Sequence, residues 1–102
     1  MQIDFERSGG FAGMTIHTSI NTDTLPTDDA RELGDLVNNA GFFNLPAKTQ
    51  QGQGADQFNY KLTVNVQGLS HTVETTDSTM PDSLKPLINR LMTQARTGGR
   101  TQ

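Results

Sequence analysis

Residues 58–66, FNYKLTVNV, alternate apolar and polar side chains at every position, and this pattern restricts the fold of the chain more than any other. Alternation of this kind is typical of a strand with one face on the core and the other in water. Gln67 and Gly68 follow as a tight turn, and residues 69–75, LSHTVET, alternate again. The two segments therefore predict an antiparallel hairpin.

A second pair of alternating segments begins the chain. Residues 1–6, MQIDFE, and residues 14–20, MTIHTSI, both change from apolar to polar with a period of two. Only the short segment RSGGFAG, residues 7–13, separates them. The spacing predicts another antiparallel hairpin.

Each predicted hairpin precedes a stretch with helical periodicity. Thr27 is the expected N-cap of the first helix, and Gly41 is the residue expected to end it. Pro86 is expected in the first turn of the second helix, because a proline deeper in a helix would kink it. The second stretch has the strongest period in the chain, with apolar residues spaced i, i+3, i+4, i+7, i+8 and i+11 at Leu84, Leu87, Ile88, Leu91, Met92 and Ala95.

The predicted elements follow one another in the order β-β-α-β-β-α. This order predicts a single α+β domain with a four-stranded antiparallel sheet and two helices packed on one face of it. Residues 1–96 are expected to form that domain. The last residues, TGGRTQ at 97–102, are expected to form a flexible C-terminal tail.

Composition excludes several classes of function. The chain has 102 residues, 32% of them hydrophobic, which fits one domain with a modest core, and it has no cysteine. Its net charge is −3 and its eight basic residues are scattered, so no nucleic-acid partner is expected. No apolar run approaches the ~20 residues that span a bilayer, and no signal peptide is recognisable at the N-terminus. We expect a cytoplasmic protein without membrane contact that is a monomer when free.

The order of the elements predicts which end of the molecule is functional. If the first helix packs back antiparallel to the second strand, the connections 7–13, 42–57 and 75–82 all lie at one end of the sheet. Long connections gathered at one end of a rigid scaffold are where function is expected. The predicted partner-binding residues are Ser8, Gly9, Gly10, Phe11, Ala12, Gly13, Asn44, Pro46, Lys48, Asp77, Thr79 and Met80.

Phe11 is a large apolar ring in the middle of a glycine-rich turn. Two interpretations are open: the ring packs back over the edge of the sheet, or it is an apolar anchor presented to a partner. The glycines beside it favour the second interpretation, because they let the backbone approach another surface closely.

No catalytic, metal or cofactor site is predicted. His17 and His71 lie on different strands with opposite parity, and no Cys or HExxH pattern accompanies them, so they are interpreted as ordinary surface and edge histidines. The Asp-rich stretch at 23–29 lacks the spacing of a calcium loop. Ser8 is not a nucleophile elbow, because no strand-to-helix turn follows it. We expect a protein that is not an enzyme.

Several segments together resemble the emfourin family, whose members are inhibitors associated with the peptidase protealysin. The similar segments are RSGGFAG at 7–13, DTLP at 23–26, AGFFNLPA at 40–47, GADQFNYKLTV at 54–64 and MPDSLKPLINRL at 80–91. The resemblance covers about residues 2–95 and keeps the order of all the segments.

The resemblance implies a protein inhibitor of a thermolysin-family zinc metallopeptidase of the protealysin type. Such an inhibitor would block the active-site cleft with the loops at one end of its sheet, in a one-to-one complex expected from a single elaborated end. Phe11 could then fill an apolar pocket beside the scissile bond. The alternative is a non-enzymatic binding or adaptor module that uses the same loops on a partner other than a peptidase.

Overall fold

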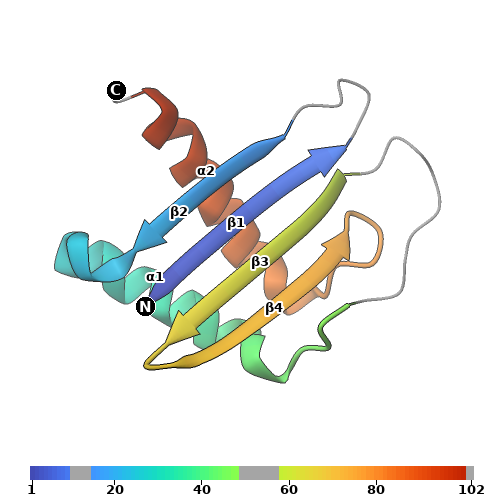
Figure 1. Ribbon diagram of the computed structural model, residues 1–102, viewed down its shortest axis with the longest axis horizontal. Coiled ribbons are helices and arrows are strands. Elements are labelled where there is room, and N and C mark those ends of the chain that lie inside the picture. The colour runs from blue at the N-terminus through green and yellow to red at the C-terminus, as the bar shows by residue number, and fades with distance from the viewer. Residues whose placement is uncertain (10–14, 49–57, 101–102) are drawn as a thin grey trace.

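A single antiparallel sheet forms one layer of the molecule, and two helices form the other (Figure 1). The computed structural model describes residues 1–9, 15–48 and 58–100. The sheet has the strand order β2-β1-β3-β4, with bounds β1 Gln2–Gly9, β2 Ile16–Asn21, β3 Phe58–Val66 and β4 Leu69–Thr76. The predicted α+β fold with the order β-β-α-β-β-α is confirmed.

Both predicted hairpins form, and β1 and β3 join them at the centre of the sheet. In this central pair Ile3 lies opposite Val64 and Phe5 lies opposite Leu62, and all four side chains are buried. The turn between β3 and β4 has positive φ at both Gln67 (51°) and Gly68 (84°). Positive φ at both central residues is the geometry of a two-residue hairpin turn whose twist matches that of the strands.

The helices α1 (Thr27–Ala40) and α2 (Lys85–Arg100) cover the same face of the sheet (Figure 1). Three short 3-10 helices flank them: η1 at Thr22–Thr24, η2 at Phe42–Asn44 and η3 at Asp82–Leu84. Strands and helices together bury one continuous core, whose largest fully buried side chains are Phe5, Phe42, Ile3, Leu33, Leu62, Leu84, Leu87 and Leu91.

The ends of α1 match the sequence prediction at one side only. Gly41 ends the helix in the left-handed conformation, with φ 61° and ψ 38°, as predicted. The prediction that Thr27 caps the N-terminus is wrong, because Pro26 is the N-cap and Thr27 is already the first helical residue. No side chain caps this end, but Asp28 and Asp29 lie in the first turn, where negative charge favours the helix dipole.

The second helix begins one residue before Pro86, so the proline lies in the first turn as predicted. Leu87, Ile88 and Leu91 are buried against the sheet. The helix continues through Arg100 and thus enters the segment 97–102 that the sequence predicts as a tail. The division of the chain at residue 96 stays a prediction.

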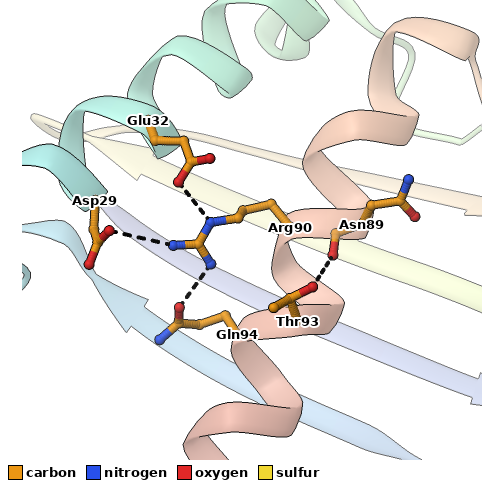
Figure 2. Close-up of polar contacts among 6 residues, drawn as sticks. All are labelled: Asp29, Glu32, Asn89, Arg90, Thr93 and Gln94. Carbon is orange, nitrogen blue, oxygen red and sulfur yellow. Dashed lines mark hydrogen bonds and ion pairs between the residues drawn. The ribbon is translucent and has the colours of Figure 1, made fainter.

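Arg90 connects the two helices through polar contacts (Figure 2). Its Nε donates to Oε1 of Glu32 at 2.9 Å, and its Nη2 lies 3.9 Å from Oδ1 of Asp29. Its Nη1 donates to Oε1 of Gln94 at 3.0 Å. Because the Arg90 side chain is only 19% exposed, these contacts satisfy a largely buried guanidinium and fix the helices relative to each other.

The sheet face that the helices leave uncovered is polar. Its residues have the parity opposite to the core and include Glu6, Lys61 and Glu74, which lie side by side on β1, β3 and β4. None of the helices in the described ranges is both long and apolar enough to cross a membrane. The structure therefore combines one apolar layer between sheet and helices with one solvent-exposed polar sheet face.

Candidate functional site

All four strands of the sheet have an end at the same side, here called the loop end (Figure 1). β1 and β4 finish there, and β3 begins there: Gly9 lies opposite Phe58, and Asn59 lies between Ser8 and Thr76. At the opposite end, here called the turn end, the two-residue turn joins β3 to β4. The predicted site residues Ser8 and Gly9 thus lie at the same end of the sheet as the turn that contains Asp77 and Thr79, with β3 between them.

Asp77 links these strand ends. Its Oδ2 accepts a hydrogen bond from the backbone amide of Phe58 at 3.0 Å, and its Oδ1 accepts one from the Tyr60 hydroxyl at 2.7 Å. One carboxylate therefore holds the first residues of β3 against the turn that follows β4. Hydrogen bonds to a charged acceptor are among the stronger ones in proteins, so this contact fixes the shape of the loop end.

The Tyr60 hydroxyl is held in its neutral form. Burial raises the pKa of Tyr60, the hydrogen bond to Asp77 and its charge raise it further, and Arg7 partly offsets these effects. The neutral phenol donates a hydrogen bond to the carboxylate, whereas a phenolate would be repelled by it. The hydroxyl of this largely buried residue thereby has the partner that an amphipathic ring requires.

Arg7 and Phe58 complete the loop end. The guanidinium carbon of Arg7 lies 4.0 Å from the centre of the Phe58 ring, a cation–π contact between β1 and β3. The alternation of residues 58–66 predicts that Phe58 and Tyr60 face the core, which is confirmed, but no pattern in the sequence marks Arg7. A tyrosine near the start of a strand, whose hydroxyl must find a partner, is the signal that could have indicated this cluster.

The turn after β4 is held by threonine side chains. Oγ1 of Thr79 accepts from the backbone amide of Thr76 at 3.2 Å and lies 2.8 Å from the Thr76 hydroxyl oxygen. The amide of Thr79 in turn donates to the carbonyl of Thr76 at 3.3 Å. Met80, the next residue, is half-buried against the core. These hydrogen bonds therefore fix the conformation of the turn, in which Asp77 contacts β3 and Met80 packs against the core.

The predicted residues Asn44, Pro46 and Lys48 do not all lie at the loop end. The segment that contains them follows the β4 edge: the Leu45 carbonyl accepts from Nε2 of His71 at 2.7 Å, and the Ala47 carbonyl accepts from the Glu74 amide at 2.9 Å. The expectation that the whole 42–57 connection lies at the loop end is wrong for its first part. Helix α1 crosses the turn end of the sheet toward β4 instead of running back along β2 (Figure 1).

Lys48 is nevertheless close to the loop end, because it forms a β-bridge with Glu74. Together with the strand ends it borders an open polar hollow of about 260 Å³. The lining combines both signs of charge with hydroxyl and amide groups, from Glu6, Ser8, Lys48, Asn59, Tyr60, Lys61, Glu74, Thr75 and Thr76. Such a surface suits polar contacts with a protein partner.

The remaining predicted residues, Gly10, Phe11, Ala12 and Gly13, lie outside the described residues. They belong to the segment that joins Gly9 at the end of β1 to β2, so the chain enters it from the loop end. That Phe11 is an apolar anchor presented to a partner therefore stays a prediction.

The two histidines have separate structural environments. His71 is half-buried against Phe42, at 5.4 Å between ring centres, and its Nε2 serves as the donor to the Leu45 carbonyl. His17 is exposed on the opposite sheet face. Within residues 1–9, 15–48 and 58–100, no group of three or more His, Asp or Glu side chains could hold a metal ion.

Comparison with known proteins gives one match. The family model described as Emfourin matches residues 5–92, which include every described strand residue of the loop end. No curated protein and no solved structure matches the chain. The family suggests that the chain inhibits a metallopeptidase and therefore has a peptidase as its partner.

Proposed function

Because the chain belongs to the emfourin family, we propose that it is a protein inhibitor of a thermolysin-like zinc metallopeptidase of the protealysin type. In this proposal the loop end enters or covers the active-site cleft and prevents substrate from binding. The complex contains one inhibitor and one peptidase, because the fold has a single elaborated end. The inhibitor carries out no reaction of its own.

The observation that carries this proposal is the organisation of the loop end by Asp77. A surface made of strand ends and a hydrogen-bonded turn is already ordered before it meets a partner. Association then costs little further conformational entropy, and more of the contact energy contributes to affinity. This is the property required of a small inhibitor, which must compete with substrate from an interface of about 1,600 Å² in total.

The proposed contact surface has a rigid part and a part that the sequence alone indicates. The rigid part consists of Ser8, Gly9, Asp77, Thr79 and Met80, with Lys48 at its border. The part that the sequence alone indicates is the glycine-rich segment from Gly10 to Gly13, with Phe11 as the apolar anchor. Thermolysin-like peptidases favour bulky apolar groups beside the scissile bond, and Phe11 would satisfy this preference. Asn44 and Pro46 are more distant along β4 and are expected to contribute least.

The proposal is tested by adding the purified protein to a thermolysin-like peptidase and following hydrolysis of a short peptide substrate. We expect inhibition that excess substrate relieves. The informative variant replaces residues 8–13 by a two-residue turn, and a thermal melt checks that it still folds. The variant should lose inhibition. Equal inhibition by the folded variant would contradict a role for the hairpin tip, and no inhibition by the wild-type protein would leave the adaptor function as the alternative.

A further inference from the structure

The two edges of the sheet differ in how they are covered. On the β4 edge, residues 45–48 lie alongside the strand, and the Glu74 amide donates to the Ala47 carbonyl. On the β2 edge, no segment among the described residues pairs with the outer side of the strand. An uncovered edge offers a row of unpaired backbone donors and acceptors to another chain.

The backbone groups that β2 leaves unpaired can be identified from its ladder with β1. The Thr22 amide donates to the Met1 carbonyl at 2.9 Å, so Thr22 directs its amide toward β1. Because amides alternate in direction along an antiparallel strand, those of His17, Ser19 and Asn21 point away from the sheet. Thr24 Oγ1 already donates to the Asn21 carbonyl at 2.8 Å, so among the described residues His17 and Ser19 form the open part of the edge.

The side chains of β2 do not protect this edge. Natural edge strands commonly carry lysine, proline or inward-pointing charges that prevent another strand from pairing. The strand Ile16–Asn21, IHTSIN, contains no lysine, arginine, aspartate, glutamate or proline. A sheet that covers one edge and leaves the other uncharged has a surface suited to pairing with an extended chain.

We propose that an extended backbone segment of the target metallopeptidase pairs antiparallel with β2 through the amides and carbonyls of His17 and Ser19. This inference rests on the proposed function and specifies how the inhibitor docks. β2 begins three residues after Gly13, the last residue of the glycine-rich segment, so a peptidase that contacts this segment lies near the strand. An endopeptidase must hold its substrates in extended form, and its cleft therefore presents backbone groups at strand spacing.

This mode of docking also explains how the inhibitor would avoid being cleaved. The inner side of β2 is fully paired with β1, from Arg7 opposite Ile16 to Gln2 opposite Asn21. The peptidase segment would receive backbone contacts from the outer side only. No peptide bond of β2 would need to leave the sheet and reach the catalytic centre.

The test removes one outward-facing donor and leaves the ladder with β1 intact. Proline is tolerated on an edge strand where the missing amide would face outward, so the variant is Ser19→Pro. Ser19→Ala is the matched control, because both variants lose the hydrogen bond from Ser19 Oγ to Asp4. Ser70→Pro is the second control, because it removes an outward-facing amide from β4, on the other edge.

We expect Ser19→Pro to raise the inhibition constant at least about tenfold, while Ser19→Ala and Ser70→Pro inhibit like the wild type. A folded Ser19→Pro protein that inhibits as strongly as Ser19→Ala would overturn the inference and leave the proposed function intact. Failure of the wild-type protein to inhibit at all would instead contradict the proposed function.

Amide exchange of the unmodified protein provides a measurement that does not depend on a variant folding. The amides of His17 and Ser19 should exchange rapidly in the free protein and slowly in the complex. Unchanged exchange in the complex would overturn the inference. Protection that appears in the free protein and rises with its concentration would also overturn it, because the edge would then be occupied by a second copy of this chain.

Discussion

At the scale of single residues, Asp77 has the largest influence on the loop end. Its two carboxylate oxygens accept from the Phe58 amide and the Tyr60 hydroxyl, and the residue itself follows β4. Its removal would leave a half-buried hydroxyl and a strand-end amide to find other partners. Loss of a partner for a polar group of this kind costs about 1–3 kcal/mol.

The Tyr60 titration reports this contact directly. We predict that Asp77→Ala lowers the pKa of Tyr60, because the carboxylate is one of the causes that raise it. Tyr60 is the only tyrosine in the chain, so the ultraviolet absorbance of tyrosinate measures this group alone. Asp82→Ala is the control, because Asp82 pairs with Lys85 at 2.9 Å and not with Tyr60. An unchanged titration midpoint in a folded Asp77→Ala protein would contradict the assigned hydrogen bond.

The same shift gives the wild-type protein a pH dependence of stability. The pKa of Tyr60 in the folded protein lies above its ordinary value of 10.0, so the folded state holds the proton more tightly than the unfolded chain. The stabilisation is therefore complete below that ordinary pKa and is lost as the pH rises through the folded-state pKa. Denaturant unfolding at several alkaline pH values should show this loss in the wild type and a smaller one in Tyr60→Phe.

Phe11→Ala separates the two interpretations of the hairpin tip. We predict an unchanged melting temperature and weaker inhibition, because the strands do not need this ring and a partner would bury it. Truncation of an interface anchor typically costs ~2 kcal/mol or more, about thirtyfold in the dissociation constant. The melt and the inhibition constant are measured on one preparation. A lower melting temperature would mean that the ring packs on its own sheet.

At the scale of elements, α2 has the most regular apolar periodicity in the sequence. Leu91 is fully buried at the centre of its apolar face. We predict that Leu91→Ala lowers the free energy of unfolding by about 2–5 kcal/mol, a large fraction of the stability of a domain of this size. Leu69→Ala makes the same change at a residue that is 61% exposed and should cost little. Equal denaturation midpoints for the two variants would show that the α2 face is not part of the core.

Local patterns predicted the helices and strands well, because the periodicity of each element is set by residues within that element. The alternation in 58–66 and 69–75 and the positive-φ turn between them correspond to β3 and β4, and the period around Leu91 corresponds to α2. The order of the strands in the sheet depends on contacts between β1 and β3, which are distant in the sequence. The alternation indicates that both strands are buried but not which strand each one pairs with.

The sequence predicted the location of the site residues only in part, because local patterns give strand direction but not contacts between distant segments. The positions of the Asp77 turn and of the end of β1 follow from strand direction alone, and both lie at the loop end as expected. The position of Asn44 depended on the path of α1, which crosses the turn end toward β4 because Phe42 and Phe43 pack against His71. Arg7 was missed because its role arises only when β1 and β3 are neighbours.

At the scale of the whole molecule, the fold separates the supporting core from the proposed contact surface. The two helices and the buried sheet face form the core, and Arg90 connects the helices on the side away from the uncovered sheet face (Figures 1 and 2). The loop end extends beyond this core and supplies only a minority of the core's buried side chains. Apart from Asp77, whose carboxylate holds the loop end together, substitutions at the loop end should therefore change affinity more than stability, and substitutions in the core should do the reverse.

The central claim is that the inhibitor occupies the active-site cleft of a thermolysin-like metallopeptidase. Isothermal titration of the peptidase with the purified protein tests it most directly, in parallel with peptidase whose cleft is filled by a small zinc-binding active-site inhibitor. We predict one-to-one binding to the free peptidase and a large loss of apparent affinity for the filled one. Equal affinity for both forms would contradict the claim, because the protein would then bind away from the cleft.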